Sequence, residues 1–244
     1  MRYDPARDLW SPMPLQSLAS LLRGCSSRWW LSGGWAIDHW AGTISRSHAD
    51  IDISTIRPGL PTLLGSLPGY LEPLAAVDGH LYPLASRIDD PDLHNIWLRD
   101  ERHGRWVLQL NVEAGDQAAW RYRRDPRIAL TWDLAVRDIA GIPTGSPAAQ
   151  LLWKSPQPRP RDDADLAFAL GILPVAERRW LGEAIQMAHP SSPWITVICG
   201  SHSSVPTNSD TTGSTDSGHQ PDQRRVMSEY QRRAKLEAPR QRTG

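Results

Sequence analysis

The chain has 244 residues, 40% hydrophobic and 22% charged, a composition typical of globular proteins. Its 27 basic residues balance 27 acidic ones, so it lacks the basic excess expected of a dedicated nucleic-acid-binding protein. Cys25 and Cys199 are too few for a disulfide framework or a structural zinc site, and neither a secretory signal nor a membrane-spanning run is recognisable. We therefore expect a cytoplasmic protein without a membrane or nucleic-acid partner.

Helical and extended patterns alternate through the first half. Pro14 is expected to open a helix that ends near Gly24, and a strand over 29–31 leads through two glycines into a short helix. The alternation of carboxylate and isoleucine over 49–54 predicts a half-buried strand. A helix is expected over 58–67, and the clearest of several short strands between 70 and 114 covers 106–113.

The second half is predicted to be helical, over 147–153, 163–170 and 174–187. We therefore expect an α+β protein, with a mixed domain over 1–140 and a C-terminal helical subdomain over 141–198. All 12 tryptophans precede residue 198, and the remainder is poor in apolar residues. The 199–244 segment is therefore predicted to be a disordered tail.

Two adjacent glycines mark the start of the short helix. Gly33 and Gly34 allow close backbone approach, and the amide groups of a first helical turn favour an anion such as a triphosphate. Ser32 would add a hydroxyl donor. A Gly-Gly pair is more commonly only a turn, so on its own it is weak evidence of phosphate binding.

Asp50 and Asp52 strengthen the phosphate interpretation. Residues two apart on a strand point to the same face, about 6.5 Å from each other. Two carboxylates aimed at one point repel each other unless a cation lies between them, and hard oxygen ligands suit Mg²⁺. The alternative is an exposed edge strand that carries two ordinary acids.

These motifs together resemble those of the aminoglycoside and lincosamide nucleotidyltransferases, which have a DNA polymerase beta-like fold. The first block is SGGWAID at 32–38, then Gly42 and Arg46-x-His48-x-Asp50-x-Asp52. The segment 120–128 (WRYRRDPRI) is similar to the same family. A second block at 151–166 contributes a lysine, two arginines and two aspartates: Lys154, Arg159, Arg161, Asp162 and Asp165. The resemblance spans about residues 15–197.

The resemblance implies a mixed nucleotidyltransferase sheet with flanking helices. It also implies Mg²⁺-dependent transfer of a nucleoside monophosphate, AMP from ATP, to a hydroxyl of a small acceptor such as an aminoglycoside-like antibiotic. Asp50 and Asp52 would hold the metal. The residues that would contact the phosphates are Ser32, Gly33, Gly34, Arg46 and Lys154. The slightly acidic folded part would suit a polycationic acceptor.

Several residues in these blocks have two interpretations. Lys154 is the only lysine before residue 199 in a chain rich in arginine, which indicates either a specific need for an ammonium group or chance. His48 would be a partner of Asp50 or Asp52, or a loop residue satisfied elsewhere. Asp38 is expected to orient the loop around Gly42. The aspartates at 162 and 165 either begin a helix or contact substrate.

One position departs from the family pattern. The fold normally supplies a third carboxylate, and its place falls at Gln109, which cannot act as a base. Glu113, on the same strand face, would replace it as a catalytic residue if the strand were shifted by one or two pleats. The rival hypothesis is therefore a catalytically weak or inactive nucleotide-binding relative.

Aromatic and basic side chains leave two further possibilities. Trp35 and Trp40 would form a stacking wall for a nucleobase or sugar, whereas Trp153 and most other tryptophans are expected in the core. The arginines at 121, 123 and 124 alternate with aromatic residues and would form either a solvated face or an anion contact near the active site.

Overall fold

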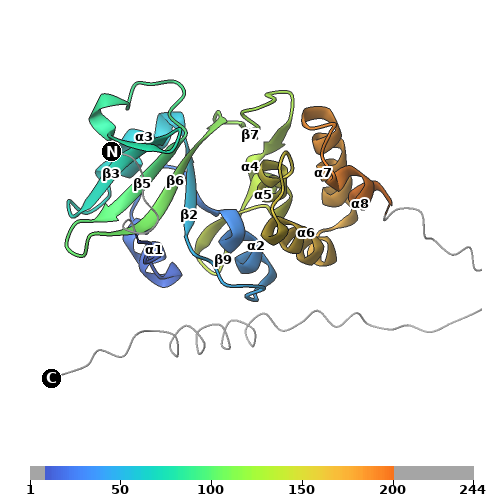
Figure 1. Cartoon of the computed structure of the whole chain (residues 1–244), viewed down its shortest axis with the longest axis horizontal. Coiled ribbons are helices and arrows are strands. Elements are labelled where there is room, and N and C mark those ends of the chain that lie inside the picture. Colours follow the sequence, from blue (N-terminus) through green and yellow to red (C-terminus); the bar gives the residue numbers. More distant parts are fainter. Residues whose placement is uncertain (1–8, 201–244) are drawn as a thin grey trace, which may run out of the picture.

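The structure is a computed structural model that describes residues 9–200. The predicted tail lies outside these residues except for its first two positions, which end a helix. Figure 1 shows strands and helices interleaved on one side and helices alone at the other. In the described part of the chain, no helix is long and apolar enough to cross a membrane.

Ten strands form one mixed sheet, in the order β4-β3-β5-β6-β2-β1-β10-β9, with β7 paired to β6 and β8 paired to β7. Two pairs are parallel, β1 with β10 and β2 with β6, and the others are antiparallel. The strand bounds are β1 Trp29–Ser32, β2 Asp52–Ile56, β3 Leu71–Val77, β4 His80–Pro83, β5 Asn95–Asp100, β6 Arg105–Gly115, β7 Ala119–Arg121, β8 Ala129–Thr131, β9 Val136–Ile139 and β10 Ile142–Gly145.

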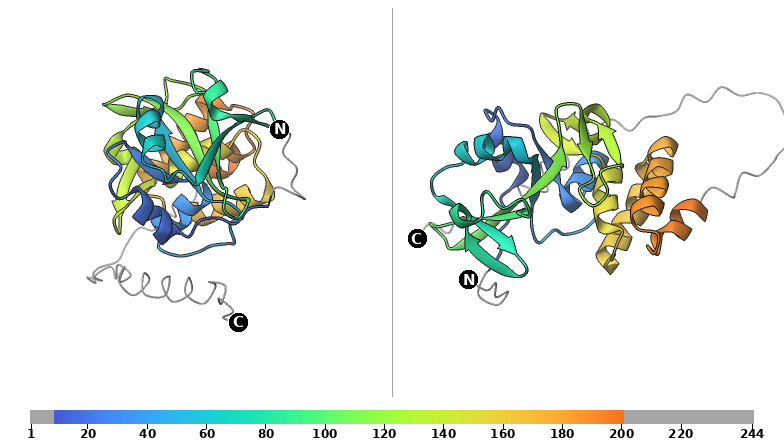
Figure 2. Two further views of the ribbon diagram at one scale, coloured as in Figure 1. Left: turned by 90° about the vertical axis from the view of Figure 1, so that its left-hand side faces the viewer. Right: turned by 90° about the horizontal axis from the view of Figure 1, so that it is seen from above.

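The helices flank the sheet and extend it at one end, as Figure 2 shows from two further directions. They are α1 Leu15–Leu22, α2 Gly33–Ala41, α3 Leu60–Gly65, α4 Trp132–Ala135, α5 Pro147–Lys154, α6 Pro160–Ile172, α7 Val175–Ala188 and α8 Trp194–Gly200. Two short 3-10 turns cover Arg57–Gly59 and Leu84–Ser86. The α+β class and the mixed sheet with flanking helices are therefore confirmed.

Most predicted elements occur where the sequence placed them. The strand over 49–54 is the exception, because β2 begins only at Asp52. The Ile51 carbonyl already accepts a hydrogen bond from the Gln109 amide (2.9 Å), and the Ile51 side chain is fully buried. The alternating pattern therefore marks the buried side correctly but begins three residues before the strand.

Two buried clusters lie on either side of the sheet. One joins α1 and α3 to the central strands, with Leu18, Leu31 and Ile53 fully buried. The other joins α5, α6, α7 and α8 to Trp120 and Tyr122. The domain boundary at 140 stays a prediction. Strand β10 follows this position in the sequence and pairs with β1, which precedes it.

Candidate active site

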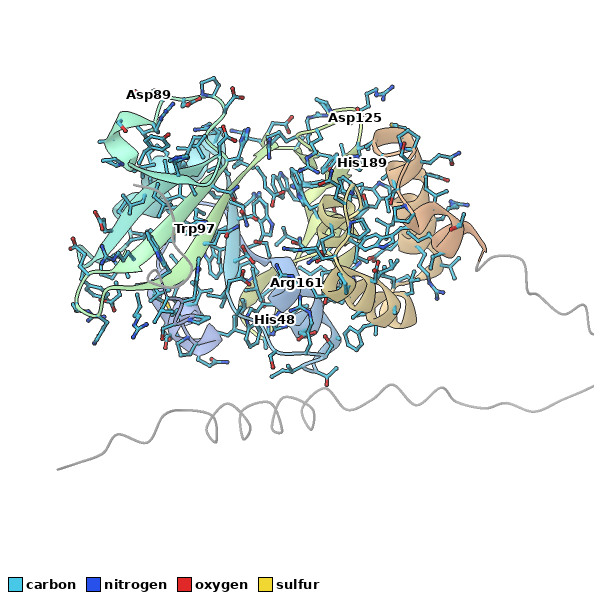
Figure 3. All side chains as sticks on the ribbon, viewed as in Figure 1. His48, Asp89, Trp97, Asp125, Arg161 and His189 are labelled. Atoms are coloured by element: carbon cyan, nitrogen blue, oxygen red, sulfur yellow. The ribbon has the colours of Figure 1, made fainter. Side chains whose placement is uncertain are left out.

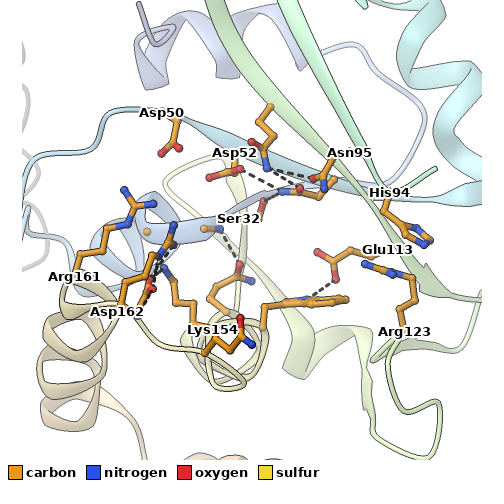
Figure 4. A pocket seen from close by; sticks show the side chains of 18 of the residues that line it. Ser32, Asp50, Asp52, His94, Asn95, Glu113, Arg123, Lys154, Arg161 and Asp162 are labelled. Atoms are coloured by element: carbon orange, nitrogen blue, oxygen red, sulfur yellow. Dashed lines mark hydrogen bonds and ion pairs between the residues drawn. The ribbon is translucent and has the colours of Figure 1, made fainter. Parts of the chain in front are cut away.

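A cavity of about 530 Å³ lies between the sheet and the C-terminal helices (Figure 4). Its walls come from β2 and β6, from the start of α2, from α5 and from the N-terminal end of α6. All eight residues predicted for the site line it: Ser32, Gly33, Gly34, Arg46, Asp50, Asp52, Glu113 and Lys154. The structure therefore brings the two sequence blocks together.

The glycine pair is required by close packing at the start of α2. Gly33 has a φ of +66°, a conformation that favours glycine, and a Cβ there would collide with the Asp52 carboxylate. A Cβ on Gly34 would lie 2.5 Å from Nη2 of Arg46. The Gly33 amide donates a hydrogen bond to Oε1 of Gln150 (2.8 Å). This amide is therefore already occupied, unlike the free phosphate donor predicted from the sequence.

Asp50 and Asp52 both face the cavity, and Figure 4 shows them on the same side of β2. Burial, and then the negative charge of Asp50, raise the pKa of Asp52 to about 7, although a hydrogen bond from Asn111 acts in the opposite direction. Asn111 Nδ2 lies 3.4 Å from Oδ1 of Asp52. A carboxylate destabilised by burial and by a like charge is one whose ionised form a divalent cation would stabilise.

This donor set fits Mg²⁺, which proteins commonly bind through one or two carboxylates together with substrate phosphates. The residues between 9 and 200 contain no group of three or more His, Cys, Asp or Glu side chains arranged to hold a metal ion. Two carboxylates would therefore be the protein ligands, and the phosphates of a nucleotide would complete the coordination.

Amide side chains occupy the place of the third carboxylate. Gln109, the position at which the third carboxylate is expected, pairs in register with Asp52 across the parallel β2–β6 ladder. Its Nε2 donates to Oδ1 of Asn111 (3.1 Å) and lies 3.3 Å from Oδ1 of Asn95. These three amides form a neutral network beside Asp52. No sequence pattern pointed to Asn95.

The register is not shifted in favour of Glu113. Glu113 pairs with Ile56, four residues beyond the Asp52–Gln109 pair, which corresponds to about 13 Å along a strand. Its Oε2 accepts hydrogen bonds from the indoles of Trp120 and Trp153, and burial raises its pKa. The prediction that Glu113 acts as the base required the strand to be shifted by one or two pleats, and the β2–β6 register shows no such shift.

A network of ion pairs joins the two sequence blocks. Arg46 donates two hydrogen bonds to Asp165, at 2.7 and 2.9 Å, and Lys154 lies 2.6 Å from Asp162 and 3.1 Å from Asp165. Arg159 also donates to Asp162 through Nε (2.7 Å). The two basic residues predicted to contact phosphates are thus each paired with a buried carboxylate.

The aspartates of this network are held ionised. Burial alone would raise the pKa of Asp162, but hydrogen bonds from Arg159 and Lys154 outweigh it and lower the pKa. The pKa of Asp165 is lowered in the same way, against burial, by Arg46 and Lys154. Asp162 also accepts a hydrogen bond from the Arg159 amide at the start of α6 (3.0 Å). Both aspartates therefore hold basic side chains in place at the cavity wall.

His48 and Asp38 contact each other, and His48 packs against Gly34 of the glycine turn. His48 Nε2 lies 2.7 Å from Oδ2 of Asp38, and both side chains are buried. Asp38 also accepts hydrogen bonds from the amide and hydroxyl of Ser45, which agrees with the predicted role in orienting the loop. Of the two interpretations of His48, the structure agrees with a loop residue satisfied elsewhere, because its imidazole pairs with Asp38 of α2.

The aromatic and charged lining also differs from expectation. Trp153 lines the cavity, whereas neither Trp35 nor Trp40 is among the lining residues in the described part of the chain. Trp35 packs against the His48 ring, and Trp40 lies under Arg137 (4.8 Å). Six cationic side chains and four acidic ones line the cavity, so the acidic cleft expected from net charge is not present.

The family comparison bears on the first block. Residues 14–70 match the model of the aminoglycoside-2''-adenylyltransferase family. This match includes β1, α2 and β2, with the glycine turn and both aspartates, and it confirms the family resemblance predicted from the sequence. No curated protein sequence matches the chain.

Three solved structures of antibiotic adenylyltransferases are similar at low identity. Lincomycin-bound LnuA, a lincosamide antibiotic adenylyltransferase, is 19% identical, with a TM-score of 0.47 over 71% of this chain and all (100%) of that one. ANT(2'')-Ia in complex with adenylyl-2''-tobramycin is 13% identical, with a TM-score of 0.48 over 71% of this chain and 95% of that one. The solution structure of ANT(2'')-Ia is 16% identical, with a TM-score of 0.45 and coverage of 70% and 89%.

Proposed function

We propose that the chain is a Mg²⁺-dependent nucleotidyltransferase that moves a nucleoside monophosphate, AMP from ATP, to a hydroxyl of a small acceptor. The observation that carries the proposal is the contact between the glycine turn and the metal strand. Gly33 adopts a positive φ directly against the Asp52 carboxylate, within the segment that matches the adenylyltransferase family. The turn thereby brings the start of α2 next to two carboxylates.

In the proposed reaction the acceptor hydroxyl oxygen forms a bond to the α-phosphorus, and the bond from that phosphorus to the bridging oxygen breaks. Pyrophosphate leaves with the bonding electron pair, and the hydroxyl proton passes to solvent. Bound Mg²⁺, held by Asp50 and Asp52, would neutralise charge on the phosphates. Arg161 and Lys154 also line the cavity, and their positive charges favour the ionised form of Asp52.

The chain's own residues would act mainly by positioning. The Arg46–Asp165 pair holds the loop before Asp50 against α6. Asp165 also holds Lys154 at the cavity wall. Gln109 orients Asn111, which in turn contacts Asp52. Positioning and electrostatic stabilisation account for most of the catalysis of phosphoryl transfer, so this arrangement suits the reaction even without a third carboxylate.

One observation favours the alternative, a nucleotide-binding relative without transfer activity. Gln109 stands where a carboxylate base would lie, and its amide cannot accept the hydroxyl proton. The two functions differ in a single measurable step, the release of pyrophosphate in the presence of an acceptor.

Pyrophosphate release from ATP and Mg²⁺ tests the proposal, with aminoglycosides as the first acceptors and lincosamides and simple hydroxylated compounds beside them. We expect release that depends on an acceptor. Asp52→Asn should reduce it by about a hundredfold or more, because a metal ligand is lost, and Glu113→Gln should reduce it far less. ATP binding without release across the panel would support the alternative instead.

A further inference from the structure

The cavity has a second end, remote from the aspartate pair. Figure 4 shows His94, Glu113 and Arg123 gathered there, on the opposite side of Asp52 from Asp50 and Arg161. Trp153 of α5 and Arg124 also line the cavity. These residues come from strand and turn segments that the function proposed above leaves without a role.

Arg123 and Arg124 are two cations without a carboxylate partner. Their guanidinium groups lie over the Trp153 ring, 5.3 and 5.5 Å from its centroid. Among residues 9–200 no acid forms an ion pair with either of them, and Nε of Arg123 is buried without a hydrogen-bond partner. By contrast, Arg46 on the other side of the cavity is fully paired with Asp165.

The neighbouring polar groups do not neutralise this charge. Glu113 directs Oε2 at two indole N–H groups, and its pKa is raised by burial. Burial, and then Arg123, lower the pKa of His94, and its Nδ1 is a second buried atom without a hydrogen-bond partner. Two guanidinium groups therefore face one carboxylate, which leaves net positive charge, and Nε of Arg123 is an unpaired donor.

The two arginines are held in place before any ligand arrives. Tyr122, directly before them, is fully buried, and its ring packs against Trp153 at 4.6 Å. Its hydroxyl bonds to Nε2 of His189 (2.7 Å), and Figure 3 shows His189 next to the turn that contains Asp125. Its amide donates to the Ile128 carbonyl (2.9 Å), which closes the turn. The segment is thus anchored through Tyr122, directly before the two arginines, and Arg124 itself is exposed in the turn.

We propose that Arg123 and Arg124, supported by Trp153, form an anion subsite that binds a carboxylate or phosphate group of the acceptor. Planar guanidinium groups bind such oxyanions through paired hydrogen bonds, and Nε of Arg123 is a buried donor without a partner. This inference rests on the proposed nucleotidyl transfer and gives its acceptor class, a small hydroxylated anion rather than a polycation. The strand register places Glu113, which lies beside Arg123, about 13 Å along the strand from Asp52. The acceptor and the nucleotide phosphates would therefore occupy different ends of the cavity.

Binding of inorganic phosphate and of glucuronate tests the subsite, measured by calorimetry with Mg²⁺ and a saturating non-hydrolysable ATP analogue already bound. The variants are the double Arg123→Gln/Arg124→Gln and the control Arg121→Gln. Arg121 lies beside them in sequence but pairs with Asp116 at the surface. We expect the double variant to lose at least about tenfold in affinity for both anions, since charge-assisted hydrogen bonds are removed, and the control to match the unmodified chain.

Equal anion binding by the double variant would overturn the inference. A loss of affinity for the ATP analogue itself would also overturn it, because the arginines would then bind the nucleotide's phosphates. Transfer to the matched sugars glucose, glucuronate and glucosamine provides the second readout. We expect glucuronate to be preferred about tenfold, and the preference to disappear in the double variant. Failure of transfer to all three sugars would show that they are not acceptors. The calorimetric comparison of the double variant with the control would still show whether Arg123 and Arg124 bind anions.

Discussion

Replacing Asp165 by asparagine tests the ion-pair network that joins the two sequence blocks. Asp165 is 1% exposed and accepts two hydrogen bonds from Arg46, whose side chain is 23% exposed, and it lies 3.1 Å from Lys154, which is 13% exposed. Removing one partner of a buried ion pair costs about 3–5 kcal/mol, because the other charge is left uncompensated. Since Arg46 keeps some contact with water, we expect the lower end, about 3 kcal/mol.

Urea unfolding followed by tryptophan fluorescence measures this loss for Asp165→Asn. The matched control is Glu183→Gln, which removes an exposed pair with Arg179 at 3.8 Å and should cost less than about 0.5 kcal/mol. The single Arg46→Gln variant and the double variant complete a cycle that isolates the pair. A loss for Asp165→Asn no larger than that of the control would refute the structural role of the network.

Three further predictions concern the turn, the network and the third carboxylate position. Gly33→Ala should abolish pyrophosphate release and destabilise the fold by about 1–2 kcal/mol, whereas Gly65→Ala, which has open space at the Cβ position, should leave release unchanged. The pKa of Asp162 is lowered in the folded state, so ionised Asp162 stabilises the fold above about pH 4, and this contribution is lost as the pH falls further. In urea titrations from pH 7 to 3, the free energy of unfolding should therefore decline less in Asp162→Asn than in the unmodified chain. Gln109→Asp should raise the rate of pyrophosphate release about tenfold or more by restoring a carboxylate opposite Asp52, and an unchanged or lower rate would show that the amide network is needed as it stands.

Local patterns were sufficient to predict the elements that carry the site. The Pro14 start of α1 and the Gly33 start of α2 follow from positions with strong backbone preferences. The eight predicted site side chains line one cavity because strand periodicity and the glycine turn are properties of short segments.

Contacts between distant segments were not predictable in the same way. Whether Arg46 contacts a phosphate or Asp165, 119 positions away, depends on how α6 packs against the loop before β2. The choice of Asp38 as the partner of His48 likewise depends on the path of that loop. The β2–β6 register, which separates Glu113 from Asp52, is set by parallel pairing of strands far apart in sequence. Arg123 Nε has no hydrogen-bond partner because it is buried and because the nearby Glu113 carboxylate accepts hydrogen bonds from two indoles instead, and composition indicates neither.

The most direct test of nucleotidyl transfer is the mass of the acceptor after incubation with ATP, Mg²⁺ and the chain. Mass spectrometry distinguishes transfer from simple hydrolysis, because only transfer leaves AMP covalently attached to the acceptor. The account predicts an adenylylated acceptor with the unmodified chain and none above background with Asp52→Asn. Pyrophosphate or phosphate release with an unmodified acceptor, or equal product from Asp52→Asn, would contradict it.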